Sequence, residues 1–572
     1  MTPSIPPHSS HTTLWERWVS HAQRNPDGQA VIHYVAGETP RVWSWQAIIE
    51  RAARYAAALK QAGVRPGHVC ATVLRHHPEF YPLYMGIEAA GAIPAVLAYP
   101  NARLHPDKFR DGLAGIARNS GLDFILTQRE LEENVRPLAT GSASSVRDIL
   151  FPLDWNDEGN LPPAPTLPHP NVDASAPCLL QHSSGTTGLQ KAIMLSHAAV
   201  LEHVTRYGHA IALTESDRVI SWLPLYHDMG LIAAFHLPLA FGIPTIQIDP
   251  FEWVMAPVLL LDAIASEKAT LSWLPNFAYN LMADRIRDED LEGIRLDGLR
   301  MLINCSEPIR AASHEKFLRR FAPLGLRASA LGGCYAMAET TFAVTQTHAD
   351  SAPAVLDASR SALAAGRFEA PSPGESVMRC ASSGAVISGC EVRVADEHGL
   401  DLPENKVGEI FIRSVSMFGG YRNNPEKTAQ VLKDGWYASG DYGFSHNSQL
   451  YVIGRKKDII IVAGKNLYPE DIEDAVGHVD GVIPGRVVAF GSEDDSAGTE
   501  QVCIVAETSR DQAPQRKALR RAIVEAGMAI DVTIARVYLA PPRWLIKSSS
   551  GKPSRSANRD RAASELKPEG TA

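Results

Sequence analysis

A loop rich in glycine and hydroxyl residues lies between two apolar runs in the segment LLQHSSGTTGLQKAIMLSH, residues 179–197. Glycines let backbone N–H groups turn toward one point, hydroxyls add donors and a lysine adds positive charge, a combination that suits a polyphosphate. The candidate phosphate-binding residues are Ser183, Ser184, Gly185, Thr186, Thr187, Gly188 and Lys191. A Walker A loop is excluded because no Gly-Lys-Ser/Thr ends the loop, and a nucleophile elbow is excluded because Gln181 replaces its first glycine. A flexible Ser/Gly turn is the alternative interpretation.

Six further segments carry residue types that can bind a nucleotide and a carboxylic acid. In chain order they are SWLPLYHDMGL (221–231), NCSEPI (304–309), CYAMAETT (334–341), YASGDYG (437–443), GRKKDIIIVAGKNLYPEDIE (454–473) and SSSGKPSR (548–555). With the loop before them, they resemble the motifs of the adenylate-forming superfamily, which includes acyl-CoA synthetases, luciferases and peptide-synthetase adenylation domains. The matches span about two thirds of the chain. The resemblance implies ATP and Mg²⁺ as cofactors and an acyl-adenylate as the product of the first step.

The resemblance also implies which residues hold the nucleotide. Adenine contacts fall to Ser306, Glu307, Pro308, Tyr335, Met337 and Ala338, ribose contacts to Asp441 and Arg455, and Mg²⁺ to Glu339. A tyrosine ring offers adenine a flat face, a carboxylate can accept both ribose hydroxyls, and carboxylate oxygens suit Mg²⁺. Local sequence alone leaves alternatives: a core tyrosine, a turn-capping aspartate after Gly440, a helix-start glutamate and a solvated arginine.

The carboxylic acid is assigned by the same resemblance to His227, Asp228, Gly230 and Ala336. His227 has no second ligand at metal spacing, so we expect it in a pocket wall rather than at a zinc ion, with a buried core histidine as the alternative. The family usually has glycine at the position of Ala336. The added methyl group predicts a shortened or reshaped acyl tunnel that favours medium-chain or unusual acids.

Lys552 lies in a Ser/Gly loop near the end of the sequence. A lone lysine there is ordinarily a solvated surface group, but the resemblance implies the catalytic lysine of the superfamily. The chemistry needs such a cation, because a carboxylate must attack the α-phosphorus of ATP while both reactants carry negative charge. A mobile small domain can supply the lysine for one step and withdraw it for the next. The expected hinge is 454–458, with Lys457 at the pivot.

Three features favour the fatty acyl-AMP ligase branch of the superfamily. The motif LPLYHDMGL is close to the sequence usual in that branch, and Ala338 stands where many CoA synthetases carry threonine. The third feature is length, since Gly389 follows Glu339 by 389 − 339 = 50 positions, far more than in CoA synthetases. In that branch such an extra segment packs between the domains and disfavours CoA, and the acyl group passes to the phosphopantetheine thiol of an acyl carrier protein. A passive surface loop is the alternative for the segment. The wording CASSGAV (380–386) departs from the family's Cys-Gly-Arg-Pro and leaves that contact open.

Other functions stay open on the sequence. An acyl-CoA ligase is the main alternative, since it differs only in the final acceptor. An amino-acid adenylation domain would need an acidic anchor for the amine where residues 226–231 read YHDMGL. A nucleotide-binding regulator without catalysis is disfavoured because Lys552, Asp441 and Glu339 are all present.

The composition is that of an ordinary globular protein. The chain has 572 residues, of which 45% are hydrophobic, and its net charge of −9 gives no basic surplus for binding nucleic acid. Seven scattered cysteines never form CxxC, which favours a reducing compartment over a disulfide framework or a zinc site. The first residues lack the charge and apolar block of a signal peptide, and residues 231–248 are too interrupted to span a membrane. We therefore expect a cytoplasmic protein that binds a fatty or related acid.

The elements that must position these motifs alternate along the first half of the chain. A helix is predicted over 45–59, followed by strands at 69–74 and 124–126, an order typical of layered α/β folds with parallel sheets. Within residues 345–388 we expect one short helix near 361–365. From residue 390 the pattern predicts β-strands that form a small barrel or sandwich. We expect an N-terminal adenylation domain over 1–453 and a small α/β domain over 459–572 that carries the lysine.

Overall fold

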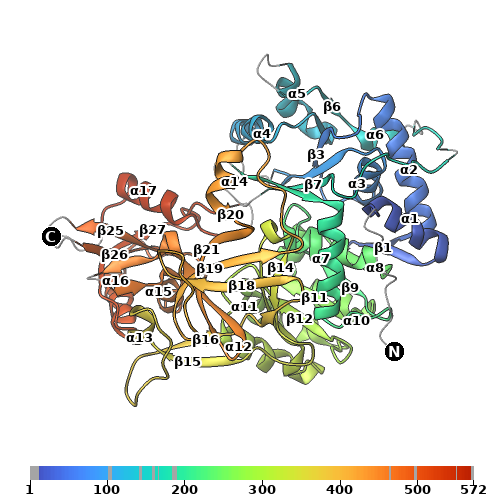
Figure 1. Cartoon of the computed structure of the whole chain (residues 1–572). Helices are drawn as coiled ribbons and strands as arrows, with labels where there is room; N and C mark the ends of the chain where they lie inside the picture. The colour runs from blue at the N-terminus through green and yellow to red at the C-terminus, as the bar shows by residue number, and fades with distance from the viewer. Residues whose placement is uncertain are drawn as a thin grey trace.

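The computed structural model describes residues 12–100, 106–140, 145–157, 161–164, 166–182, 190–462, 465–494, 499–548 and 551–568. It is a layered α/β protein with a large N-terminal domain and a small C-terminal domain, which confirms the predicted fold class (Figure 1). The C-terminal segments drawn in red form a lobe on the opposite side of the molecule from the blue helices α1 and α2. In the described part of the chain, no helix has both the length and the apolar composition needed to cross a bilayer.

The largest sheet forms the floor of the N-terminal domain. Its nine strands run in the order β17 (Ala385–Val386), β14 (Ala343–Gln346), β13 (Leu331–Ala336), β12 (Met301–Asn304), β11 (Leu271–Leu274), β9 (Val219–Ser221), β10 (Thr245–Ile248), β1 (Gln29–Tyr34) and β2 (Arg41–Ser44). The pairs from β13 to β1 are parallel, and the outer strands join antiparallel. Strands β9 to β12 are buried at every residue, as expected when both faces of a parallel sheet are covered.

A second, smaller sheet is parallel throughout. Its order is β4 (Ile93–Val96), β3 (Val69–Val73), β5 (Phe124–Thr127) and β6 (Asp148–Leu150). The helices of this region are α1 (Leu14–Arg24), α2 (Trp45–Gln61), α3 (Phe80–Ala89), α4 (Pro106–Ser120), α5 (Glu132–Thr140) and α6 (Pro152–Asp157). The predicted helix and both predicted strands are α2, β3 and β5. Ser44 begins α2 by accepting a hydrogen bond from the N–H of Ala47 at 3.2 Å.

An antiparallel hairpin links this region to the rest of the domain. It consists of β7 (Pro177–His182) and β8 (Ala192–Ser196), so the two apolar runs around the candidate phosphate loop are strands, as predicted. The helices that follow are α7 (His197–Ala210), the π-helix η2 (Met229–His236), α8 (Leu237–Phe241), α9 (Pro250–Met255), α10 (Val258–Ser266), α11 (Asn276–Arg285) and α12 (Ala311–Phe321). Ser196 begins α7 by accepting a hydrogen bond from Ala199 N–H at 3.1 Å.

The β-rich part after residue 390 is one antiparallel sheet. Strands β18 (Cys390–Ala395), β19 (Gly408–Ser414), β21 (Trp436–His446) and β20 (Leu432–Lys433) follow in order, and β22 (Gln449–Arg455) also pairs with β21; α14 (Pro425–Val431) precedes β20. This sheet is the small β-rich subdomain that the sequence predicts. Among the described strands no ladder joins β18 to β22, so this sheet is open.

The segment between 345 and 388 holds more structure than the sequence predicted. Its helix α13 (Arg360–Ala364) confirms the expected short helix, but β15 (Val355–Ser359) and β16 (Val377–Ala381) also pair across it. The rest of this segment is rich in alanine, serine and proline, and β15 lacks regular apolar alternation, so the strand signal is weak.

The C-terminal domain has its own core. A sheet of β25 (Val487–Asp494), β26 (Thr499–Glu507) and β27 (Ile534–Ala540) packs with α15 (Pro469–Gly477), α16 (Ala513–Met528) and α17 (Arg555–Glu565), and the short strands β23 (Ile460–Val462) and β24 (Lys465–Leu467) precede them. Ile460, Ile472 and Ile504 belong to that core and not to the N-terminal one. The exact domain boundary at 454–458 stays a prediction.

Candidate active site

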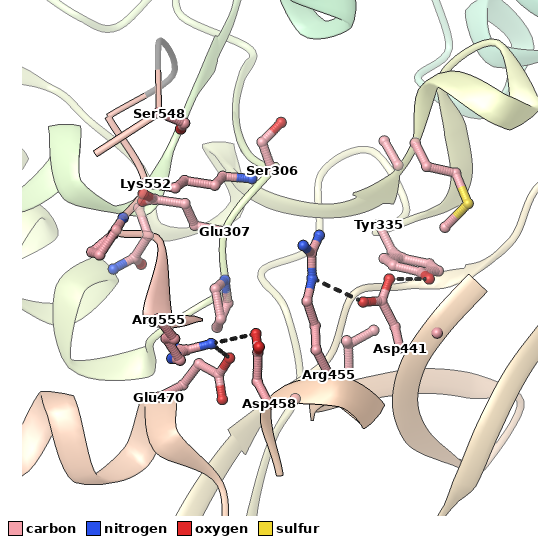
Figure 2. Close-up of a pocket in the computed structure, with 18 of the residues that line it drawn as sticks. Ser306, Glu307, Tyr335, Asp441, Arg455, Asp458, Glu470, Ser548, Lys552 and Arg555 are labelled. Carbon is pink, nitrogen blue, oxygen red and sulfur yellow. Dashed lines mark hydrogen bonds and ion pairs between the residues drawn. The ribbon is translucent and has the colours of Figure 1, made fainter. Parts of the chain in front are cut away.

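A large cavity of about 2600 Å³ lies where the two domains face each other. Its walls include the ends of β13 and β22, the turn after β12, the turn after β9, and the loop that precedes α17 (Figure 2). Segments more than 300 residues apart in the chain, such as Asp228 and Lys552, therefore line one space. Most of the residues that the motifs singled out line this cavity.

Asp441 sits between two partners, Tyr335 on β13 of the nine-stranded sheet and Arg455 on β22, the strand that pairs with β21. The hydroxyl of Tyr335 donates to one of its oxygens at 2.7 Å, and Arg455 Nε lies 3.3 Å from the other. Asp441 and Arg455 are register partners on β21 and β22, so the sheet itself holds the pair. The turn expected after Gly440 is corrected, since both residues lie within β21, where Gly440 has a φ of +72° that glycine adopts most readily.

Tyr335 and Arg455 both hold their protons more tightly beside the Asp441 carboxylate. Burial and the neighbouring Asp441 carboxylate raise the pKa of Tyr335 well above its ordinary value, so the phenol stays protonated and donates. Asp441 raises the pKa of Arg455 further, so the guanidinium stays charged. Such a carboxylate can accept two hydroxyl protons of a ribose, the arrangement expected from the sequence.

The candidate adenine residues line the same cavity from two loops. Ser306, Glu307 and Pro308 follow β12, and Ser306 has a φ of +70°, a left-handed conformation uncommon outside glycine. Glu307 accepts a hydrogen bond from the N–H of Phe277 at 2.9 Å, which ties the turn to the start of α11. Tyr335, Met337 and Ala338 form the other wall. Tyr335 is 8% exposed, so the core and pocket interpretations of this residue both hold.

The segment assigned to the carboxylic acid enters the cavity just before the π-helix η2. His227 Nδ1 and Asp228 Oδ1 are 2.7 Å apart, and Asp228 also accepts from Met229 N–H at 2.8 Å. Burial pushes the pKa of Asp228 up, but His227, the Met229 amide and the charge of Lys552 outweigh it and lower the pKa. Gly230 is required here, because a Cβ would lie 2.4 Å from the Pro224 carbonyl oxygen. Single π-helical turns are frequent at functional sites.

His227, Asp228 and Ala336 line the cavity, the last of them at the end of β13. Gly230 is buried and does not line the cavity.

A cluster of side chains that could bind a metal occurs elsewhere in the described chain, at Glu88, Cys178 and His197. Those residues are buried in the N-terminal core, where His197 Nδ1 already accepts a hydrogen bond from Leu14 N–H at 3.2 Å.

Glu339 and Lys191 meet around one tyrosine that the sequence analysis did not single out. Tyr421 donates to Glu339 Oε1 at 2.7 Å, and the Lys191 ammonium lies 3.4 Å from the Tyr421 hydroxyl and 4.7 Å from its ring centroid. Burial lowers the pKa of Lys191, and the charge of Glu339 opposes that shift. Tyr421 follows two glycines in FGGY, a turn signal that could have drawn attention to it.

The other members of the candidate phosphate loop lie outside the described residues: Ser183, Ser184, Gly185, Thr186, Thr187 and Gly188. Lys191 is described, and it places the end of the loop beside Glu339. A carboxylate oxygen next to a lysine expected to bind phosphate fits Mg²⁺, which binds one or two carboxylates together with substrate phosphates.

Lys552 reaches the cavity from the C-terminal domain. Its side chain extends toward Ser306 (Figure 2). Two backbone hydrogen bonds hold the residue, since Ser548 N–H donates to the Lys552 carbonyl at 2.8 Å and Gly551 N–H donates to the Ser548 carbonyl at 2.9 Å. Burial and then the charge of Arg455 lower the pKa of Lys552, while Glu307 and Asp228 oppose the shift. The ordinary solvated position of a lone lysine is therefore excluded. Lys457, the expected pivot, is exposed in the turn after β22.

Comparison with known proteins assigns the family. Residues 18–422 match the family model described as AMP-binding enzyme. Mycobacterium tuberculosis FadD30, named as a probable long-chain-fatty-acid–AMP ligase, is 31% identical over 507 residues, which cover 83% of this chain and 84% of that protein. A Caulobacter vibrioides protein provisionally named acyl-CoA synthetase is 29% identical over 532 residues, covering 92% of this chain and 91% of its own.

Solved structures agree with these relatives. A structure from work on fatty acyl-adenylate ligases of E. coli and L. pneumophila matches with a TM-score of 0.89 and 25% identity, covering 96% of this chain and 97% of that chain. The L. pneumophila fatty acyl-adenylate ligase in complex with acyl adenylate and pyrophosphate matches with a TM-score of 0.72 and 26% identity, covering 98% and 97%.

Replacing Lys552 by alanine tests its position in the cavity. We expect Lys552→Ala to lower the rate of acid-dependent ATP–pyrophosphate exchange by about 10²–10³-fold, the usual cost of one preorganised charge-stabilising group. Thiol transfer from added acyl-adenylate should remain largely intact, because that step does not need the cation. Equal loss in both half-reactions would contradict the assigned role.

The lowered pKa of Lys552 predicts an early alkaline limit to activity. The lysine is cationic only below its pKa, so kcat/KM for exchange should fall as pH rises, at a pH below the ordinary lysine value of 10.5. In Lys552→Arg, this alkaline fall in kcat/KM should occur at a higher pH, since arginine stays charged. Lys547 is the matched control, because burial lowers its pKa to about 8 as well. An alkaline fall that moves in Lys547→Arg and not in Lys552→Arg would overturn the assignment.

Proposed function

This chain belongs to the AMP-binding enzyme family, and we propose that it is a fatty acyl-AMP ligase that passes its acyl group to a carrier-protein thiol. In the first step a fatty or related carboxylate attacks the α-phosphorus of ATP, forming the C–O–P bond of acyl-AMP while the bond to pyrophosphate breaks. The observation that carries the proposal is the meeting of Lys552 with Asp228, Tyr335, Asp441 and Arg455 in one interdomain cavity.

In this proposal each wall of the cavity has one task. Tyr335 and the turn 306–308 hold adenine, with Met337 and Ala338 beside them, and Asp441 with Arg455 holds the ribose. Lys191 and the adjoining loop 183–188 hold the β- and γ-phosphates. These contacts fix the α-phosphate near the acid, and positioning of this kind supplies much of the rate enhancement in phosphoryl and nucleotidyl transfer.

Lys552 supplies the charge that this geometry requires. Its ammonium would bridge the attacking carboxylate and the α-phosphate, which offsets their repulsion and stabilises the charge of the transition state. Mg²⁺, held by Glu339 and the substrate phosphates, would supply further positive charge against the polyphosphate when it is bound.

The second step transfers the acyl group to a thiol. We propose that the small domain turns about 454–458, with Lys457 at the pivot, and that a phosphopantetheine thiol then attacks the acyl carbon and releases AMP. The thiol loses its proton and the C–S bond replaces the acyl C–O bond. Withdrawal of Lys552 in this turn would open the space that the thiol needs.

The extra segment between Glu339 and Gly389 supports a carrier protein as the acceptor. Arg360 of this segment pairs with Asp471 at the start of α15 in the small domain. Such a tie restrains the small domain against the large one. It supports the expectation that the segment limits transfer to free CoA, although the Caulobacter relative keeps an acyl-CoA ligase as the second candidate.

We also propose a cytoplasmic location. All seven cysteines are unpaired, and six of them are buried, which is typical of a reducing compartment.

Offering both acceptors in parallel tests the function. We expect fatty-acid-dependent ATP–pyrophosphate exchange, and acyl-thioester formation on a holo carrier protein at a rate well above that on CoA. A carrier protein that lacks phosphopantetheine is the control. Absence of exchange across a broad panel of acids would refute the proposed activity, and preferential transfer to CoA would replace the proposed acceptor.

Removing the methyl group of Ala336 tests the acyl pocket. We expect Ala336→Gly to shift the chain-length optimum toward longer acids, since one methyl group is worth about 1 kcal/mol against a group that needs its space. The measurement is kcat/KM for exchange across a series of saturated acids. An unchanged profile would remove Ala336 from the determinants of chain length.

A further inference from the structure

Arg555 lies among three carboxylates at the edge of the active-site cavity. Its guanidinium approaches Asp458 and Glu470 at 2.7 Å each and Glu473 at 2.7 Å and 2.9 Å (Figure 2). All four side chains are at most 17% exposed, so water screens these contacts poorly. The resemblance to the family assigned no role to Arg555, and none of the steps proposed above uses this residue.

Arg555 and the catalytic lysine, Lys552, are close in the sequence. Arg555 is the first residue of α17 and follows Lys552 by three positions. Asn558, in the next turn of α17, binds both the N–H and the carbonyl of Ile546, at 2.8 Å and 2.9 Å. Ser554 N–H also donates to the Ile546 carbonyl at 3.1 Å, so the described residues on both sides of Lys552 are fixed to the start of α17, and a shift of Arg555 would move Lys552 with it.

The carboxylates belong to the elements that meet the large domain. Asp458 lies at the end of the expected hinge, and Glu470 and Glu473 lie in α15. The start of α15 is held from the other side, because Arg310 donates to the Glu470 carbonyl at 2.7 Å and Arg360 pairs with Asp471. Contacts thus run from the large domain through α15 to Arg555 and on to the loop of Lys552.

We infer that Arg555 is a positioning residue that couples the hinge and α15 to the Lys552 loop, so that closure of the small domain delivers the lysine to the reacting atoms. This inference rests on the proposed function, because it assigns Arg555 to the adenylation step. In this inference the guanidinium of Arg555 is held by Asp458, Glu470 and Glu473, and it acts on the reaction through Lys552.

The charge balance argues that this contact is specific rather than merely stabilising. A cation at the first residue of a helix is disfavoured by the helix dipole, so α17 alone gives no reason for an arginine there. Burial raises the pKa of Glu473, Arg555 opposes that shift, and the neighbouring Glu470 adds to it. A planar fork can bind several carboxylates at fixed angles, whereas lysine offers a single point of charge.

Conservative replacement separates positioning from folding. We expect Arg555→Lys to lower kcat of ATP–pyrophosphate exchange about 10- to 100-fold with little change in KM for ATP, since a misplacement of about 1 Å can cost ~100-fold. Transfer from added acyl-adenylate to a holo carrier protein should change less than threefold. Arg559→Ala is the control in the same helix, because its partner Asp560 is exposed and neither residue lines the cavity.

A double variant makes the test sharper. If Arg555 acts through Lys552, Arg555→Lys should cost little further exchange activity in a Lys552→Ala background. Fold losses that multiply in the double variant, or equal losses in both half-reactions of Arg555→Lys, would overturn the inference. Full exchange activity in Arg555→Lys would also overturn it while leaving the proposed function intact, whereas a wild-type protein inactive with every acid would instead refute the proposed function.

Discussion

The proposed reaction joins two anions, a carboxylate and the α-phosphate of ATP, and the cation that lets them meet, Lys552, belongs to the C-terminal domain. A carboxylate and the α-phosphate of ATP repel each other, and the cavity that gathers them is built mainly by the N-terminal domain. Lys552 enters this cavity only because the loop before α17 lies against it. In the proposed mechanism, the hinge, α15 and the contacts between the domains all serve this one approach. The motifs of the sequence therefore fall on two domains, and the site is complete only when these domains lie together.

The cavity is prepared for negative charge before any substrate enters. Burial lowers the pKa of both Lys191 and Lys552, which means that each ammonium lacks part of the solvation it would have in water. Phosphate and carboxylate groups restore that stabilisation when they bind, so the electrostatic gain is concentrated in the substrate complex. Asp441 is arranged in the opposite sense, since Tyr335 and Arg455 hold its carboxylate in place as an acceptor.

Much of this site was predictable because each motif couples a residue type to a task. The helix at 45–59, the early strands and the convergence of Asp441, Tyr335 and Lys552 followed from local pattern and resemblance, whereas the antiparallel pairing of β7 with β8 came from the structure. The strands β15 and β16 did not, since their weak apolar alternation hides them. Tyr421 and the carboxylates around Arg555 were also missed, because such contacts depend on tertiary packing between distant segments. Gly440 and Asp441 signalled a turn, but pairing with β22 places them inside a strand.

The most direct measurement is a crystal structure of the protein with a non-hydrolysable acyl-adenylate analogue in the cavity. The account predicts Lys552 Nζ within hydrogen-bond distance of the oxygens at the acyl–phosphate junction, with the Asp441 carboxylate on the ribose hydroxyls. An analogue bound in this cavity while Lys552 points into bulk solvent and the two domains keep the same contacts would contradict the central claim.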